Sequence, residues 1–339
     1  MCCPYPKFRA FDGSRGRSKP ADRDAMEEAN QEILLGSLFE TGPRPGIRHI
    51  TIGSFDGVHR GHQEVLSRLL ALPPGPKACG VVTFEPHPLT VICPERSPPR
   101  LTTPAQKVRL LAASGAALVF VVRFDRKLSE LSPEAFFEWV VRIFPHLQTV
   151  VVGQDFRFGR DAAGDVGRLR EIGTRMDFAV RIVPPLLDNG SRVASSRIRQ
   201  AIRERRFDDA ERWLGRSYAV VGQVAPGEGI GRRIGTPTAN LTDIAQLLPP
   251  EGVYACRARI PEEFPAVANY GRRPTLGSGS SPRLEVHLLG FAGDLDRREI
   301  EVSHWHFLRE EKRFASLEEL RAQIAADVVE ARNHFALAR

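Results

Sequence analysis

Two histidines spaced three residues apart are the first side chains in this sequence that could do chemistry. His59 and His62 lie in the string Ile-Gly-Ser-Phe-Asp-Gly-Val-His-Arg-Gly-His at 52–62. An apolar segment at 47–52 predicts a strand before them, and a helix is expected over 61–70. A helix N-terminus offers free N–H groups to an anion, and imidazoles beside it can stabilise charge that develops on a phosphate. The string predicts a phosphate site, although a bare His-x-x-His pair is more often a surface feature.

The composition favours small anionic partners. The chain has 339 residues and a formal net charge of +7. It contains no run of five or six basic residues, so we expect phosphorylated small molecules rather than nucleic acid. No segment has the length and apolar character of a membrane span. Because the five cysteines show no metal-binding spacing, we expect a reduced, cytoplasmic protein without zinc or disulfides.

The sequence pattern predicts two domains after an extension. Residues 1–45 are charged and weakly patterned, and we expect them to be poorly ordered. From 46 to 215, strand and helix candidates alternate, which is typical of a doubly wound parallel α/β sheet. From 216 to 339, short strands with Gly and Pro turns predict a small antiparallel β-barrel followed by a C-terminal helix. Ser316 and Glu319 have the spacing of a capping box for that helix.

The expected elements place several loops at one edge of the first sheet. Its predicted strands are 47–52, 78–84, 118–124, 149–152 and 179–183. Its predicted helices lie near 63–70, 103–113, 133–143 and 164–174, with two short helices within 195–215. The barrel strands are expected at 218–224, 253–259, 267–270, 284–291 and 299–307. Ligands of parallel sheets bind beyond the carboxyl ends of the strands, so we expect one crevice formed by 53–62, 85–88 and 153–159.

Three further segments of the first domain carry groups suited to a nucleotide. In 152–159, Asp155 can accept hydrogen bonds or contact a metal, and Phe158 offers a flat face. The string Thr-Phe-Glu-Pro-His-Pro at 83–88 follows another strand. Ser-Ser-Arg-Ile-Arg at 195–199 opens a helix with hydroxyls and guanidiniums that could hold a triphosphate. Taken alone, the first and last of these are more often a turn and a helix cap.

These segments occur in the order and spacing of the FAD synthetase branch of the nucleotidylyltransferase superfamily, which the chain resembles over 50–199. The resemblance implies that this domain transfers AMP from ATP to the phosphate of FMN. It implies catalytic roles for His59 and His62 on the ATP phosphates. The family's Ser-Ser-Thr-x-Ile-Arg run begins here with Ala194, so one hydroxyl is missing. The ATP-binding set implied by resemblance comprises Gly53, Phe55, Asp56, Gly57, His59, Gly61, His62, Ser195, Ser196 and Arg199, and the flavin or nucleotide pocket comprises Phe84, Pro86, His87, Asp155 and Phe158.

The second domain carries a different set of polar groups. Thr238 and Asn240 place a hydroxyl and an amide oxygen two residues apart, and both are hard ligands suited to Mg²⁺. A turn held by these side chains is the simpler interpretation without context. The glycine-rich stretch 227–235 before them matches no standard nucleotide loop. Glu285 lies on the polar face of an alternating strand at 284–288, either as a solvated carboxylate or as a general base.

Together with 269–275 and 308–314, these groups resemble riboflavin kinase over about 214–335. The resemblance implies that Thr238 and Asn240 bind Mg²⁺–ATP and that Glu285 activates the 5′-hydroxyl of riboflavin. The chain departs from the family at Leu295, Asp296 and Arg297, where Leu-Tyr-Gly is usual. Further ATP or flavin contacts implied for the kinase are Gly231, Gly235, Pro237, Asn269 and Arg309.

The sequence is therefore identified as a member of the bifunctional riboflavin kinase/FAD synthetase family. We expect riboflavin, FMN and ATP with Mg²⁺ as small-molecule partners, and neither nucleic acid nor membrane; the sequence indicates no oligomeric state. One alternative is a kinase with a degenerate first domain, which Ala194 mildly favours. Another is a non-catalytic, flavin-responsive binding protein, which the magnesium and base residues Thr238, Asn240 and Glu285 disfavour.

Overall fold

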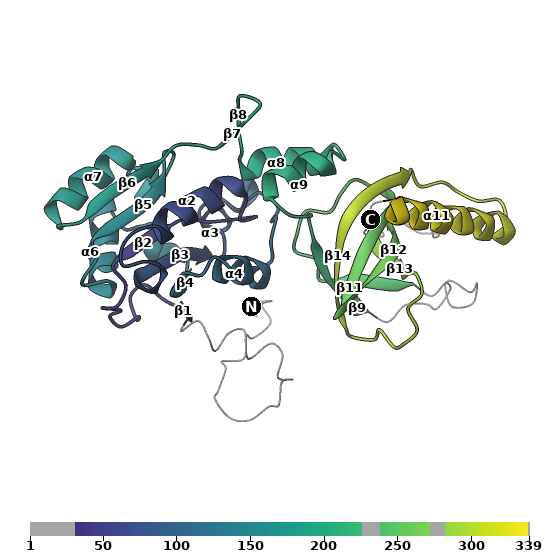
Figure 1. The fold of residues 1–339 in the computed structure, drawn as a ribbon, viewed down its shortest axis with the longest axis horizontal. Helices are drawn as coiled ribbons and strands as arrows, with labels where there is room; N and C mark the ends of the chain where they lie inside the picture. The colour runs from purple at the N-terminus through teal and green to yellow at the C-terminus, as the bar shows by residue number, and fades with distance from the viewer. Residues whose placement is uncertain (1–30, 226–237, 272–281, 338–339) are drawn as a thin grey trace.

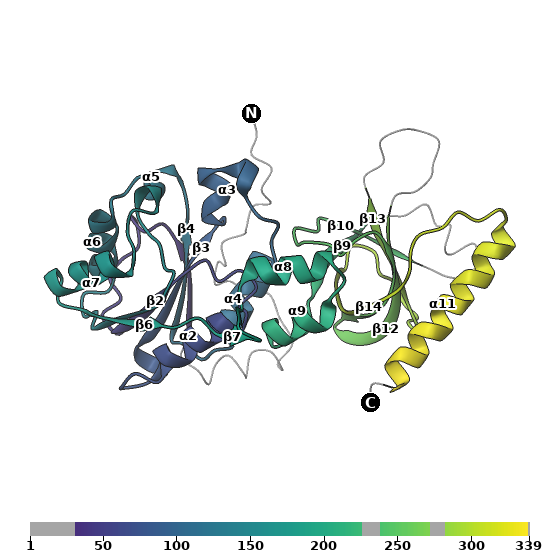
Figure 2. The same ribbon diagram turned by 90° about the horizontal axis from the view of Figure 1, so that it is seen from above.

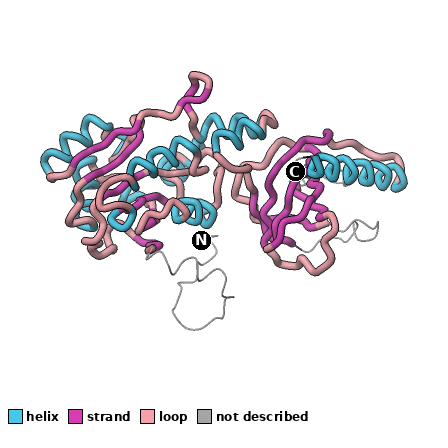
Figure 3. The backbone as a smooth tube through the Cα atoms, in the orientation of Figure 1, coloured by secondary structure: helices cyan, strands magenta, loops and turns pink. Residues whose placement is uncertain are grey.

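A computed structural model describes residues 31–225, 238–271 and 282–337 of the chain. Figure 1 shows an α/β body, coloured purple to teal, beside a barrel coloured green to yellow. Figure 3 shows the strands of the two bodies as separate groups. From above, in Figure 2, two helices (α8 and α9) lie between the bodies. The predicted combination of a parallel α/β domain and an antiparallel barrel is confirmed.

The first body is built on a six-stranded sheet in the order β1-β4-β3-β2-β5-β6, with every pair parallel. The central strands are almost completely buried, as expected for apolar strands covered by helices on both faces. Its strands are β1 (Glu32–Gly36), β2 (His49–Ile52), β3 (Cys79–Glu85), β4 (Leu118–Arg123), β5 (Thr149–Gly153) and β6 (Ala179–Val183).

Most helices of this body begin where the sequence provides a capping side chain, whereas α8 and α9 have none. The side chains of His59, Thr103, Ser132 and Asp165 each accept a backbone N–H at the start of a helix. A small hairpin, β7 (Leu187–Asp188) and β8 (Ser191–Arg192), precedes the last two helices. The helices are α2 (Arg60–Leu70), α3 (Pro88–Ile92), α4 (Pro104–Ala112), α5 (Arg126–Ser129), α6 (Pro133–Ile143), α7 (Val166–Arg175), α8 (Ser195–Arg203) and α9 (Phe207–Leu214), with 3-10 turns η1 (Pro76–Ala78), η2 (Pro94–Arg96) and η3 (Arg160–Ala162).

The edge strand β1 corrects the expected extension. It pairs in parallel with β4, and the Gln31 side chain donates to the carbonyls of Ala112 and Ala116. The prediction of poor order was therefore wrong for residues 31–45, whereas residues 1–30 lie outside the described part. An edge strand is covered less completely than a central one, and Leu35 is 62% exposed. Its sequence consequently lacks the continuous apolar run that identified the central strands.

The second body is a closed barrel in the order β10-β13-β12-β11-β14-β9, with antiparallel pairs. The predicted strands are confirmed, and β10 adds a strand that the pattern did not predict. The terminal helix buries Ala331 and Phe335 against the barrel, and Ser316 accepts the Glu319 N–H at its start. The elements are β9 (Val220–Ala225), β10 (Ala239–Thr242), β11 (Gly252–Ile260), β12 (Glu262–Gly271), β13 (Arg283–Leu288), β14 (Glu299–Arg309) and α11 (Leu317–Leu337).

The apolar core continues from one body into the other. Trp213 and Leu214 of α9 belong to the same buried cluster as Tyr218 and the barrel residue Tyr254. Gly215 ends α9 in the left-handed region, at φ 73°, a conformation that glycine adopts readily at the C-terminus of a helix.

The interface between the bodies also has a polar part, centred on α4. Gln106 accepts a hydrogen bond from Gln246 at 2.8 Å and donates to Glu301 at 3.3 Å. The backbone N–H of Leu247 donates to the carbonyl of Arg100 at 2.8 Å. The barrel therefore contacts the segment that runs from β3 into α4 as well as the helices between the bodies.

Cutting the chain at Arg216 tests how independent the two bodies are. We expect fragment 216–339 to fold and phosphorylate riboflavin, because every expected kinase residue lies within it. It should melt at a lower temperature than the barrel in the whole chain, because Tyr218 and Tyr254 lose their packing against α9. Circular dichroism melts and a kinase assay would measure both. A folded fragment without kinase activity would show that the site needs the first body.

Candidate active sites

The loop between β2 and α2 has an unusual backbone. Three of its residues have positive φ angles: Phe55 at 50°, Gly57 at 82° and Val58 at 39°. Left-handed conformations are disfavoured for residues other than glycine, so surrounding contacts must hold this turn. The loop ends at His59, whose Nδ1 accepts the His62 backbone N–H at 3.3 Å. The sharp turn thus places both histidines at the first turn of α2.

The two histidine rings are stacked, with centroids 3.6 Å apart and planes at 16°. Burial, helped by the charge of Arg192, lowers the pKa of His59 to about 4. Burial, with the neighbouring His59 and Arg192, lowers the pKa of His62 well below its ordinary value. Both rings are therefore neutral at pH 7. Because Nδ1 of His59 accepts a hydrogen bond, its proton is assigned to Nε2, which can donate to a ligand.

A cavity of about 430 Å³ lies beside the histidines. It is lined by the loops that follow β2, β3 and β5 and by the start of α8, so the three predicted loop segments do meet in one crevice. The expected residues that line it are Gly53, Phe55, His59, Gly61, His62, Phe84, His87, Asp155 and Ser195. The expected residues outside its lining are Asp56, Gly57, Pro86, Phe158, Ser196 and Arg199.

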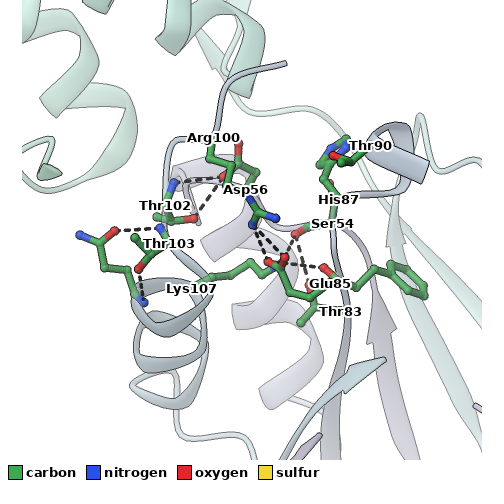
Figure 4. A network of polar contacts seen from close by, with 12 residues as sticks. Ser54, Asp56, Thr83, Glu85, His87, Thr90, Arg100, Thr102, Thr103 and Lys107 are labelled. Carbon is green, nitrogen blue, oxygen red and sulfur yellow. Dashed lines mark hydrogen bonds and ion pairs between the residues drawn. The ribbon is translucent and has the colours of Figure 1, made fainter. Parts of the chain in front are cut away.

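Asp56 and Arg199 form a buried ion pair behind the cavity. The Asp56 carboxylate also accepts the backbone N–H of Leu101 at 3.1 Å and of Thr102 at 3.2 Å, part of which is visible in Figure 4. Arg199 donates in addition to the carbonyl of Pro99 at 2.6 Å. Buried charges of this kind require full pairing, so both side chains are occupied by protein contacts that fasten the loop.

In the segment after β5, the phenylalanine that lines the cavity is Phe156 rather than Phe158. Phe158 is only 7% exposed and packs edge-on against Phe137, with Phe136 nearby. Phe156 lines the cavity and stacks on Phe158. Beyond β5 the chain leaves the strand alternation, so the sequence pattern alone could not tell which of the two phenylalanines faces a ligand.

Arg192 is a cavity residue that the sequence analysis missed. It lines the cavity, forms an ion pair with Asp155, and its positive charge contributes to the lowered pKa values of His59 and His62. Its position three residues before Ser195, next to an expected triphosphate clamp, was the available signal. This guanidinium gives the cavity a positive group that can reach an anionic ligand.

Lys107 of α4 was also missed, and Figure 4 shows it reaching toward the loops after β2 and β3. Its ammonium lies 2.7 Å from the Glu85 carboxylate and donates to the carbonyl of Phe84 at 2.8 Å and of Ser54 at 3.3 Å. Arg100 contacts the same carboxylate at 2.8 Å. Burial lowers the pKa of Lys107, with Glu85 opposing that shift. This network holds two cavity loops in a fixed relation.

A second group of polar side chains lies across three barrel strands. Glu285 of β13 is in register with Asn240 of β10 and with Asn269 of β12. Their sequence neighbours, such as Leu284 and Val286, are buried in the barrel, so the polar row lies on the outer face. The buried Oδ1 atoms of both asparagines accept no hydrogen bond within the described part of the chain. Gly231, Gly235 and Pro237 lie outside the described residues.

Arg309 contacts the terminal helix. It donates to the two carboxylate oxygens of Asp327 at 2.9 and 2.7 Å, and Asp327 is only 3% exposed. The bidentate pair anchors α11 to β14.

The segment at 295–297 forms a tight turn, in which the Arg298 N–H donates to the Leu295 carbonyl at 3.1 Å. Arg297 has φ 56° where the family usually has a glycine. Leu295 still packs on the barrel core.

Comparison with known proteins identifies both bodies. Residues 45–197 match a family model described as FAD synthetase, and residues 214–335 match one described as riboflavin kinase. A bifunctional riboflavin kinase/FMN adenylyltransferase of Pseudomonas fluorescens is 41% identical over 285 residues, 83% of this chain and 91% of that protein. The chain belongs to the bifunctional riboflavin kinase/FMN adenylyltransferase family. Its Escherichia coli K12 member is 40% identical over 298 residues, 86% of this chain and 93% of that protein.

Structural similarity extends over both bodies. A solved structure titled "Crystal Structure of Macrolide-efflux Protein from Streptococcus pneumoniae" aligns with a TM-score of 0.75 and 28% identity, covering 89% of this chain and 99% of that one.

Within the described ranges, no helix combines the length and the apolar character needed to cross a membrane. The predicted bifunctional enzyme of flavin synthesis is thus confirmed, and neither alternative is supported.

The neutral histidines predict a pH-dependent stability. Between pH 6.5 and about 4 the unfolded chain protonates His59 while the folded chain does not. The unfolded state then binds more protons, so the free energy of unfolding decreases as the pH is lowered, by about 1.4 kcal/mol per pH unit for a buried histidine. We expect a lower melting temperature at pH 5 than at pH 7, and a smaller loss in His59→Gln. The exposed His146 provides the control, His146→Gln; an equal loss in His59→Gln would contradict the assignment.

Proposed function

We propose that the cavity beside His59 and His62 is where ATP and FMN react in the α/β domain. The observation that carries the proposal is the stacked, neutral histidine pair at the first turn of α2, facing a cavity that also holds Arg192. A helix N-terminus and neutral N–H donors suit a polyphosphate. Arg192 would exchange its partner Asp155 for a phosphate, which brings a positive charge to the ligand in addition to the neutral donors.

The proposed adenylyl transfer needs no protein nucleophile or base. An oxygen of the FMN phosphate attacks the α-phosphorus of ATP, the bond to the β-phosphate oxygen breaks, and pyrophosphate leaves. The attacking group is already an anion, so the protein aligns the reactants and stabilises charge. His59 Nε2–H and the N–H groups of α2 would donate to the phosphates. Phe84 and Phe156 supply aromatic faces to the same cavity for a planar ring.

The proposed kinase site is the polar row on the barrel. Riboflavin contributes an alcohol, so a base must take its proton as the oxygen attacks the γ-phosphorus and ADP leaves. Glu285 would take that proton at its carboxylate. Thr238 and Asn240 would hold Mg²⁺, and the buried, unpartnered Oδ1 of Asn240 within the described chain supports this fit. Bound Mg²⁺ shields the negative charge of the triphosphate. Asn269, in register on the other side of Glu285, would orient the carboxylate or riboflavin.

Replacing His59 should suppress FAD synthesis alone. We expect His59→Ala to lower the rate of FAD formation from FMN and ATP by about 10²–10³, the usual effect of losing one preorganised donor. Phosphorylation of riboflavin should stay near normal, because that site lies on the barrel. Chromatographic separation of flavins measures both. The exposed His146→Ala is the matched control, and full FAD synthesis by His59→Ala would remove this histidine from the mechanism.

Replacing Glu285 should have the reverse effect. Glu285→Gln keeps the size of the side chain but cannot take a proton, so riboflavin phosphorylation should fall by about 10²–10⁴. FAD synthesis from supplied FMN should be unchanged. Assays with riboflavin and with FMN as separate substrates measure each step. The exposed carboxylate variant Glu262→Gln on the neighbouring β12 is the control. Unchanged riboflavin phosphorylation would remove Glu285 from the mechanism.

A further inference from the structure

The strained loop before α2 is held from outside by the segment that joins the two domains. Arg216 follows Gly215, the residue that ends α9, and precedes β9. Its guanidinium donates to the carbonyl of Gly57 at 2.8 Å. Its other terminal nitrogen lies 3.5 Å from the carbonyl of Val58 and 3.4 Å from that of Leu214. A residue between the domains is thus bonded to the two loop residues directly before His59.

A second side chain, Gln63, contacts two of the same carbonyl groups. Gln63 of α2 donates to the carbonyls of Val58 and Leu214, each at 2.9 Å. Arg216 and Gln63 together therefore tie the end of α9 to the loop at one place. Burial lowers the pKa of Arg216 to about 10, so the guanidinium keeps its charge at neutral pH. Its partly buried, charged contacts to carbonyls are of the stronger kind.

The loop needs such contacts on both sides. Asp56 fastens one side to Leu101 and Thr102. The next two residues, Gly57 and Val58, both have positive φ, and their carbonyls are the ones that Arg216 and Gln63 hold. A Cβ at Gly57 would lie 2.9 Å from the Leu101 side chain, so the loop is also packed closely from that direction. Without Arg216, the Gly57 carbonyl loses the side-chain donor that the structure gives it, and the loop can relax toward ordinary φ values.

We propose that Arg216 is a positioning residue for adenylyl transfer: by fixing the Gly57 and Val58 carbonyls, it sets the place of His59 at the cavity. The inference rests on the proposed site at His59. It assigns a role in the first domain's reaction to the residue between the two domains. Displacing a preorganised group by about 1 Å can cost roughly 10²-fold in rate, so a loosened loop should be visible in kcat.

The test compares Arg216→Met, Arg216→Lys and Arg212→Met in the full chain. Methionine keeps much of the aliphatic length but offers no donor, whereas lysine restores a charged donor at one point. Arg212 is the matched control, because it lies in the last turn of α9, four residues before Arg216, and pairs with Asp209 and Asp188 instead. We expect Arg216→Met to lower kcat for FAD synthesis by about 10- to 100-fold, Arg216→Lys to recover part of it, and Arg212→Met to match the wild type.

Three readouts separate positioning from a loss of folding. Riboflavin phosphorylation by the same Arg216→Met preparation should stay within about twofold of wild type, and the kcat for FAD synthesis should fall more than KM for ATP rises. Wild-type kcat in Arg216→Met would overturn the proposal. A loss of FAD synthesis that Arg216→Lys does not recover would also overturn it. The same holds if the lost fraction of activity equals the fraction of Arg216→Met that is unfolded at the assay temperature in a thermal melt. His59→Ala tests the site separately: full activity there, with a loss in Arg216→Met, would place the reaction elsewhere.

Discussion

The buried carboxylate of Asp56 is the constraint on which the first site depends. An unpaired charge in a protein interior is very costly, so a buried Asp must be surrounded by donors. Those donors come from two places that are distant from Asp56 in sequence: the adjacent residues Leu101 and Thr102, through their backbone N–H groups and the Thr102 hydroxyl, and Arg199. The hydroxyl of Ser195 donates to the Asp56 carbonyl at 2.9 Å. Satisfying one carboxylate therefore fixes the loop after β2 against α8 and against the segment before α4.

The segment 100–107, which includes the start of α4, also contacts the barrel. Arg100 and Gln106 contact Gln246, Leu247 and Glu301 of the second body. The next residue along α4, Lys107, reaches the cavity loops instead. Neighbouring positions of one helix thus contact the barrel and the first site. The two domains share an apolar core and polar contacts. The change of sequence pattern at residue 216 therefore does not separate two independently packed cores.

Sequence patterns predicted the elements that depend on local periodicity. They did not predict contacts between residues that are distant in sequence. The central strands and the longer helices follow from apolar spacing, and the place of His59 and His62 follows from the predicted step from a buried strand to a helix. By contrast, Asp56 and Arg199 are 143 residues apart, and no local feature reveals that they pair with each other.

The same limit explains two smaller misses. Phe136 and Phe137 of α6 bury Phe158, which leaves Phe156 at the cavity. Strand β1 is half-covered at the sheet edge, so its apolar pattern is incomplete. In each case the deciding contact comes from an element elsewhere in the chain, and a window of sequence cannot contain it.

The electrostatics of the two proposed sites differ because their nucleophiles differ. The phosphate of FMN is already charged, so the first site needs donors and positive groups but no proton acceptor. Its neutral histidines, the Arg192 guanidinium and the start of α2 fit that requirement. The 5′-hydroxyl of riboflavin is neutral, so the second site needs a base. There the barrel aligns Glu285 between two amide side chains, Asn240 and Asn269. The first site therefore has mainly hydrogen-bond donors, and the second has mainly oxygen acceptors. This difference matches the charge of the nucleophile in each reaction.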